Sequence, residues 1–95
     1  MYKTKTKVCN KWGLHARPTA AVVKEASKYK SEITITNPRN KINSNGKKVM
    51  EVLMLCAYQN TELIVKADGE DEKIAAENVA RVIREFKIGD EDENY

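Results

Sequence analysis

The sequence predicts an α+β domain in which helices cover one face of an antiparallel sheet. Two kinds of periodicity carry this prediction. Several short segments alternate polar and apolar residues, as half-buried strands do, whereas others repeat apolar residues at the helical period of 3.6. The segments follow one another as strand, helix, strand, strand, helix, strand, helix. With 95 residues, the chain is long enough for a single small domain with a modest core.

Composition is that of an ordinary globular protein, with 41% hydrophobic and 33% charged residues. The net charge of +3 is mild and the basic residues are spread along the chain, so nucleic-acid binding gains little support. No apolar run approaches the roughly 18 residues of a membrane span, and residues 1–5 lack the apolar stretch of a signal peptide. We therefore expect a cytoplasmic protein that neither binds nucleic acid nor inserts into membranes.

The first strand is expected over residues 3–9, where lysine alternates with Thr, Thr and Val. A loop follows, in which Gly13 is free in φ. The first helix should run from about Ala16 to Lys28, because proline is tolerated in a first helical turn. Its apolar stripe, at spacings of three and four residues, comprises Pro18, Val22, Ala26 (or Glu25) and Tyr29.

Residues 31–36 alternate again and place two isoleucines on one face, which predicts the second strand. Residues 37–40 form a turn by composition, because proline presets φ and asparagine tolerates the left-handed region. A short return strand over residues 41–43 completes a hairpin. Residues 44–46 give a second turn signal.

Residues 47–56 favour a short helix that packs one face on the sheet and leaves some apolar side chains exposed. We expect Met54 and Leu55 to lie in the core, and Val49 and Leu53 to divide between core and surface. The next strand is expected over residues 62–67, which have a hydrophobic centre.

Acidic residues at positions 68–72 favour the N-terminus of a last helix. That helix repeats apolar residues at the 3.6-residue period, and residues 89–95 are expected to form an acidic, frayed tail. The apolar positions are Ile74, Ala75, Val79, Val82, Ile83 and Phe86.

Cys9 and Cys56 lack the spacing of metal ligands. With one histidine and no CxxC pair, we expect no metal site and no cofactor. The spacing leaves a disulfide between them open. A reducing cytoplasm favours free thiols that behave as small, partly buried apolar residues.

His15, the only histidine, is the candidate reactive residue. It should lie at or just before the N-cap of the first helix. Amides in the first turn of a helix have no intrahelical acceptor and attract anions, here through Ala16 and Arg17. The planar fork of Arg17 suits phosphate or carboxylate oxygens, and a cation at this helix end runs against the dipole, which favours an anion-binding role. The pattern predicts that His15 itself carries a phosphoryl group. An ordinary N-cap histidine without chemistry is the alternative.

The stretch Gly13-Leu14-His15-Ala16-Arg17-Pro18 closely resembles the active-site motif of HPr, the histidine phosphocarrier family of the bacterial sugar phosphotransferase system. The resemblance extends from Lys3 to about Ile88, through the lysine-rich turn that enters the second helix and the acidic run that precedes the third. It implies one domain over residues 1–88, folded as an open-faced sandwich of four antiparallel strands and three helices.

The resemblance also implies a role for each site residue. His15 would accept a phosphoryl group on Nδ1 from phosphorylated enzyme I and pass it to the A domain of a sugar permease. Ala16 and Arg17 would hold the phosphoryl oxygens without binding them too tightly for transfer. A monomeric carrier of this kind is a phosphoacceptor and donor rather than a stand-alone enzyme.

A patch for docking partners is implied as well, and lysines near it are suited to meet acidic groups and speed encounter. Met is well suited to a surface that recognises several partners, because its side chain repacks easily. The implied patch residues are Ala20, Val49, Met50 and Leu53, and the lysines are Lys24, Lys47 and Lys48.

Several positions depart from the family pattern. Lys48 stands where many members carry a serine that a regulatory kinase phosphorylates, so this control is predicted to be absent, and we do not expect Ser44 to replace it. Trp12 stands where many members have a small polar residue, and is a candidate partner contact. Cys56 and Asn60 occupy positions that favour glycine.

Two other functions remain open at this point. One is a regulatory module of the same family, in a nitrogen-related or permease-lacking phosphotransferase chain, that controls targets by its phosphorylation state. The other is a transcription co-regulator under control of a serine kinase, against which Lys48 argues.

Overall fold

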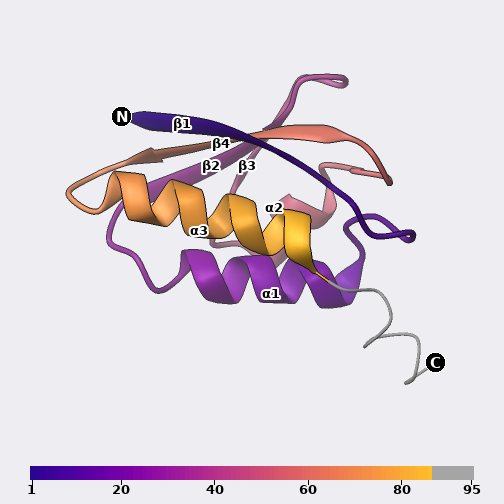
Figure 1. Cartoon of the computed structure of the whole chain (residues 1–95), viewed down its shortest axis with the longest axis horizontal. Helices are drawn as coiled ribbons and strands as arrows, with labels where there is room; N and C mark the ends of the chain where they lie inside the picture. The colour runs from indigo at the N-terminus through magenta and orange to yellow at the C-terminus, as the bar shows by residue number, and fades with distance from the viewer. Residues whose placement is uncertain (87–95) are drawn as a thin grey trace.

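Seven elements follow one another in the predicted order (Figure 1). The structure, a computed structural model, describes residues 1–86, so the expected tail and the expected domain end at residue 88 lie outside the described residues. The strands are β1 (Tyr2–Lys7), β2 (Glu32–Asn37), β3 (Ile42–Asn45) and β4 (Glu62–Asp68). The helices are α1 (Ala16–Ala26), α2 (Val49–Leu53) and α3 (Glu72–Glu85).

The four strands form one sheet in the order β1-β4-β2-β3, and every neighbouring pair is antiparallel. All three helices lie on one face of it (Figure 1). This is the predicted α+β open-faced sandwich. The strands alternate as expected: the lysines of β1 are exposed, and Ile33 and Ile35 of β2 are buried.

The second hairpin strand is longer than the sequence indicated. Ser44 pairs with Ile35 and Asn45 with Thr34, so β3 continues into the segment predicted as a turn. The hydroxyl of Ser44 donates to the carbonyl oxygen of Ile35 at 3.2 Å, which satisfies this buried polar group.

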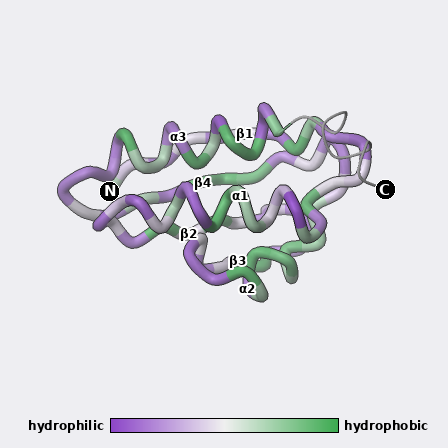
Figure 2. Tube along the Cα trace, turned by 90° about the horizontal axis from the view of Figure 1, so that it is seen from below, coloured by the Kyte–Doolittle hydropathy of each residue, from purple (hydrophilic) through white to green (hydrophobic). Residues whose placement is uncertain are grey.

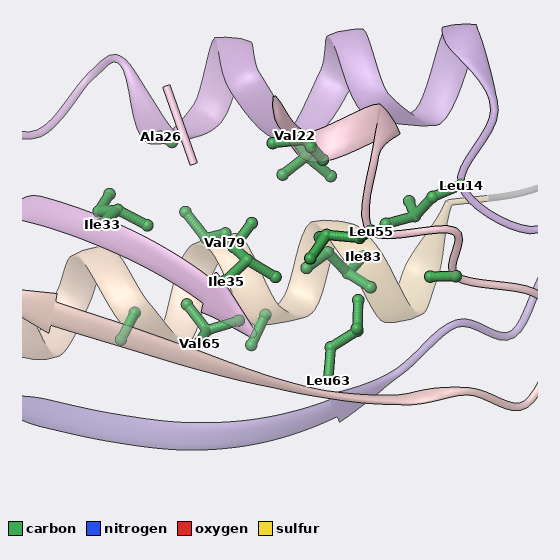
Figure 3. Close-up of a cluster of buried hydrophobic side chains, with 14 of the residues drawn as sticks. Leu14, Val22, Ala26, Ile33, Ile35, Leu55, Leu63, Val65, Val79 and Ile83 are labelled. Carbon is green, nitrogen blue, oxygen red and sulfur yellow. The ribbon is translucent and has the colours of Figure 1, made fainter. Parts of the chain in front are cut away.

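The core lies between the sheet and the helices (Figure 3). Val22 of α1 and Val79 and Ile83 of α3 point toward the inward side chains of β2 and β4, and each is fully buried. Burying a side chain of this size contributes about 1.5–3 kcal/mol. Hence the hydrophobic stripes hold α1 and α3 in place, and α1 in turn fixes where His15 lies.

Two apolar residues expected in the core are exposed. Met54 is 63% exposed, while Val52 and Leu55 are fully buried. Val52 and Leu55 are three residues apart and share the inward face of this turn, whereas Met54, two residues after Val52, lies on the outward face. Ile74 is 56% exposed because α3 presents a neighbouring face to the sheet. That face includes two alanines, Ala76 and Ala80, outside the predicted stripe.

The expectation of partly buried thiols is also wrong. Cys9 and Cys56 are both exposed and free. Cys9 follows buried Val8 and therefore points outward, as alternation along an extended chain requires. Cys56 lies between buried Leu55 and Ala57, and its φ of 52° turns its side chain to solvent.

Candidate functional site

His15 is the N-cap residue of α1, as the sequence predicted. Its backbone is extended, with φ −95° and ψ −164°, and its carbonyl oxygen accepts the N–H of Thr19 at 3.0 Å. The helix is therefore capped through the backbone of His15 and not through its imidazole. The side chain is half-buried at the molecular surface, where a reacting partner can approach it.

The loop before His15 is held from both sides. Leu14 is buried in the core beside Leu55 (Figure 3), and its N–H donates to the carbonyl oxygen of Ala57 at 2.9 Å. Gly13 has φ +75°, and a Cβ at this position would lie 2.5 Å from the same oxygen. Only glycine fits such a close approach in the left-handed region. The bond and the contact fix the direction in which His15 leaves the loop.

The first turn of α1 forms the anion-attracting end of the site. Ala16 and Arg17 are exposed beside His15, and Pro18 is buried and has no N–H to satisfy. No acidic side chain occurs between Ala16 and Thr19, so the positive end of the helix dipole keeps its full effect on an incoming anion.

The predicted docking residues lie on two helices that contact each other, α1 and α2. Figure 2 shows α2 as an apolar segment at one side of the helical layer, beside β3. Ala20 is exposed on α1. On α2, Met50 is 71% and Val49 is 40% exposed, while Leu53 is half-buried.

The lysines near this patch differ in their contacts. Lys24 is exposed on α1. Lys48 is the N-cap residue of α2, and its ammonium nitrogen lies 3.9 Å from Oε2 of Glu51. The ammonium of Lys47 donates to the carbonyl oxygen of Tyr29 at 2.7 Å, so this lysine helps to tie the β3–α2 turn to the end of α1.

Two large exposed side chains were not predicted as such from the sequence. Met54, predicted as core, and Tyr58, which was not singled out, are 63% and 69% exposed. Tyr58 follows Ala57, the residue that accepts the Leu14 amide, and so belongs to the neighbourhood of His15. Its position five residues after Leu53, the last residue of the short α2 helix, gave no periodic signal.

Residues 1–86 contain no group of three or more His, Cys, Asp or Glu side chains that could hold a metal ion. In the same range, none of the helices has the length and apolar character to cross a membrane.

Comparison with known proteins connects this geometry to a family. The sequence model described as "PTS HPr component phosphorylation site" matches residues 2–85. The phosphocarrier protein HPr of Buchnera aphidicola subsp. Baizongia pistaciae is 37% identical over 87 residues, which cover 92% of this chain and 100% of that protein.

Solved structures agree. HPr of Thermoanaerobacter tengcongensis superposes with a TM-score of 0.80 and 35% identity, over 87% of this chain and 91% of that one. Crh of Bacillus subtilis, a catabolite repression protein solved as a domain-swapped dimer, gives a TM-score of 0.69 and 34% identity, over 87% and 93% of the two chains.

Proposed function

This chain belongs to the HPr family of the phosphotransferase system, and from that premise we propose that His15 is the residue that carries the phosphoryl group. As a member of this family the protein is a phosphocarrier. The observation that carries the proposal is the position of His15 at the N-cap of α1, directly before Ala16 and Arg17.

The transfer step uses the lone pair of the neutral imidazole. Nδ1 of His15 attacks the phosphorus atom of the donor, a P–N bond forms, and the bond from phosphorus to the donor group breaks. The electron pair of that broken bond leaves with the donor group. The proton stays on Nε2, so the phosphorylated ring carries a positive charge that offsets part of the negative charge of the phosphoryl oxygens. The reverse step on an acceptor releases the group again, because a P–N bond of this kind is labile.

Arg17 and the amide of Ala16 hold the phosphoryl oxygens during the step. Charge on these oxygens is met by the guanidinium fork and by the positive end of α1. Removal of one such donor lowers the rate of group transfer by about 10²–10³ in well-studied active sites. Because a carrier must release its cargo, we expect a smaller effect in Arg17→Ala, about tenfold to a hundredfold in the rate of phosphate acceptance.

Incubation with enzyme I and phosphoenolpyruvate tests the assignment of His15. Phosphorus NMR should show one phosphohistidine signal for the parent protein and none for His15→Ala. Arg17→Ala should give the same signal more slowly. If His15→Ala accepts as much phosphate as the parent protein, the assignment of His15 is wrong.

The family implies partners within the phosphotransferase system. We propose that they are enzyme I as donor and the A domain of a sugar permease as acceptor, and that they dock over Ala20, Val49, Met50 and Leu53. Exposed Met50 and Val49 support this surface, because exposed apolar patches mark interaction sites. In phosphorylation by enzyme I, Met50→Ala should have a higher KM as substrate than the parent protein and a similar kcat.

We also propose that the protein acts as a monomer in the cytoplasm. Crh, its structural relative, was solved as a domain-swapped dimer, so the oligomeric state needs a direct measurement. Light scattering at micromolar concentration should give the mass of one chain. A stable dimer would contradict the proposal.

The regulatory serine of the family is replaced by Lys48, and we propose that control by a serine kinase is absent. Lysine offers no hydroxyl to such a kinase. The parent protein should not be labelled by a kinase that phosphorylates HPr of other bacteria on serine, whereas Lys48→Ser should gain the label. Labelling of the parent protein would show that another residue, such as Ser44, serves instead.

One observation favours the regulatory alternative, namely the likeness to a catabolite repression protein. The two functions differ in the acceptor. A sugar carrier passes its phosphoryl group to the A domain of a permease, whereas a regulatory module keeps the group and binds a target in one phosphorylation state. Transfer to a permease A domain from the same organism distinguishes them.

A further inference from the structure

Two aromatic side chains flank the His15 loop and are exposed. Trp12, the only tryptophan of the chain, is 55% exposed and Tyr58 is 69% exposed. Trp12 and Tyr58, here called the aromatic pair, lie on different segments of the chain, and neither belongs to the patch on α1 and α2. Trp and Tyr are among the residues most enriched in binding hot spots.

The two segments that carry the aromatic pair are fastened to each other. The Leu14 amide donates to Ala57 at 2.9 Å, and a Cβ on Gly13 would lie 3.0 Å from the Cα of Tyr58. On the other side, the N–H of Asn60 donates to the carbonyl oxygen of Val8 at 2.6 Å. Trp12 and Tyr58 are thus the neighbours of residues that touch, and both begin from a fixed backbone.

Fixed aromatic residues are efficient anchors. Each has only two side-chain torsions to order on binding, so a large contact area is gained at a low cost in conformational entropy. Tyr58 is held further by its own turn, in which its N–H donates to the hydroxyl of Thr61 at 3.2 Å and its carbonyl oxygen accepts the Thr61 N–H at 3.1 Å.

The position of Trp12 in the chain places it close to where any protein that delivers a phosphoryl group to His15 must dock. The reacting atoms must approach to about 3–3.5 Å, and a stable interface covers about 800 Å² on each partner, a patch of about 16 Å radius. Trp12 precedes His15 by three residues, which span at most about 11 Å of extended chain. The Cα of Trp12 therefore lies within a donor footprint of this size that is centred on His15.

We propose that the aromatic pair is an additional docking anchor, which inserts into an apolar pocket of phosphorylated enzyme I. This inference rests on the proposed transfer to His15. The ammonium of Lys11 lies 5.3 Å from the centroid of the Trp12 ring, so a positive charge accompanies the indole into the interface. A pocket that suits both side chains is apolar at its floor and has carboxylates at its rim.

Steady-state kinetics of phosphorylation by enzyme I and phosphoenolpyruvate test the proposal. Trp12→Ala should raise the KM for this protein about tenfold or more, as truncation of a hot-spot residue does, and leave the kcat within about twofold. Tyr58→Ala should act in the same direction. Trp12→Phe, which keeps an aromatic ring at this position, should restore most of the affinity and shows that the effect is not a loss of folding.

Ile74→Ala is the matched control. Ile74 is 56% exposed on α3, so its truncation removes a comparable exposed apolar side chain away from the His15 loop. Its KM should equal that of the parent protein. If Trp12→Ala behaves like Ile74→Ala, the aromatic pair is no anchor. If Trp12→Ala impairs only the later transfer to a permease A domain, the assignment to enzyme I is wrong.

Fluorescence separates this proposal from that of His15. The single tryptophan reports directly on its own burial, so adding enzyme I should shift the emission of the parent protein to shorter wavelength. His15→Ala, which accepts no phosphate, should show the same shift because docking remains. A parent protein that is phosphorylated without any shift contradicts the anchor alone, whereas a shift in a protein that never accepts phosphate contradicts the transfer alone.

Discussion

The N–H of Leu14 donates to the carbonyl oxygen of Ala57 at 2.9 Å, and this bond joins the loop before His15 to the segment that follows α2. The side chain of Leu14 enters the core next to Leu55, so both the backbone and the side chain fix the loop. His15 and the end of α2 are in this way parts of one rigid surface. A partner that recognises one of them meets the other in a constant geometry.

Gly13→Ala tests how tightly this junction is closed. The added methyl group would lie 2.5 Å from the oxygen of Ala57, at a φ of +75° that disfavours any side chain. The free energy of unfolding should fall by about 1–3 kcal/mol, and phosphate acceptance should slow as His15 moves. Urea unfolding measures the first effect. Exposed Ser27→Ala, without such strain, should stay within about 0.5 kcal/mol of the parent.

Cys56→Gly should stabilise the protein. Cys56 has φ +52°, a conformation that costs a non-glycine residue about 1–2 kcal/mol. Glycine removes this strain but loses about 0.5–1 kcal/mol in chain entropy, so we expect a net gain of about 0.5–1 kcal/mol. The midpoint of urea unfolding under reducing conditions should rise at constant slope. Cys56→Ala keeps the strained backbone and should bring no gain; an equal gain would trace the effect to the thiol.

Val52→Ala and Met54→Ala should differ strongly, although Val52 in α2 and Met54, its C-cap, lie only two residues apart. Val52 is fully buried and Met54 is 63% exposed. Loss of two buried methyl groups and the resulting cavity should cost about 2 kcal/mol, whereas truncation of Met54 should change the free energy of unfolding by less than about 0.5 kcal/mol. Equal losses would mean that both side chains pack in the core.

The contact between Asp71 and the start of β2 should make stability depend on pH. The hydroxyl of Ser31 and the backbone N–H groups of Lys30 and Ser31 all donate to the Asp71 carboxylate, the two amides at 2.9 and 3.0 Å. These bonds, the Ser31 hydroxyl first, hold the pKa of Asp71 below its ordinary value of 3.8.

A lowered pKa in the folded state means that the contribution of Asp71 is fully present above pH 3.8 and is lost as the pH falls through the folded-state pKa. Asp71→Asn should therefore be less stable than the parent at neutral pH, and the difference should narrow in acid. Urea unfolding of both proteins, at neutral pH and at a pH below 3.8, measures the stability difference under the two conditions. A difference independent of pH would assign the loss to hydrogen-bond geometry and not to charge.

Local pattern was sufficient for much of this protein. Alternation along β1 and β2, the 3.6-residue stripe of α1 and the position of Pro18 predicted the order of the elements and placed His15 at the N-cap. These features depend on residues close together in the chain, so the sequence alone determined them. The same holds for the motif from Gly13 to Pro18, through which the family was identified.

Tertiary structure decided what local pattern leaves open. A helix as short as α2 has no repeat that predicts which of its residues are buried. Packing against β3 and α1 determines that Val52 is buried and Met54 is exposed. For α3, packing against the sheet buries the alanine-rich face of the helix and leaves Ile74 exposed. The segments that carry Trp12 and Tyr58 are joined by the bond between Leu14 and Ala57, and contact between distant segments arises only when the chain has folded.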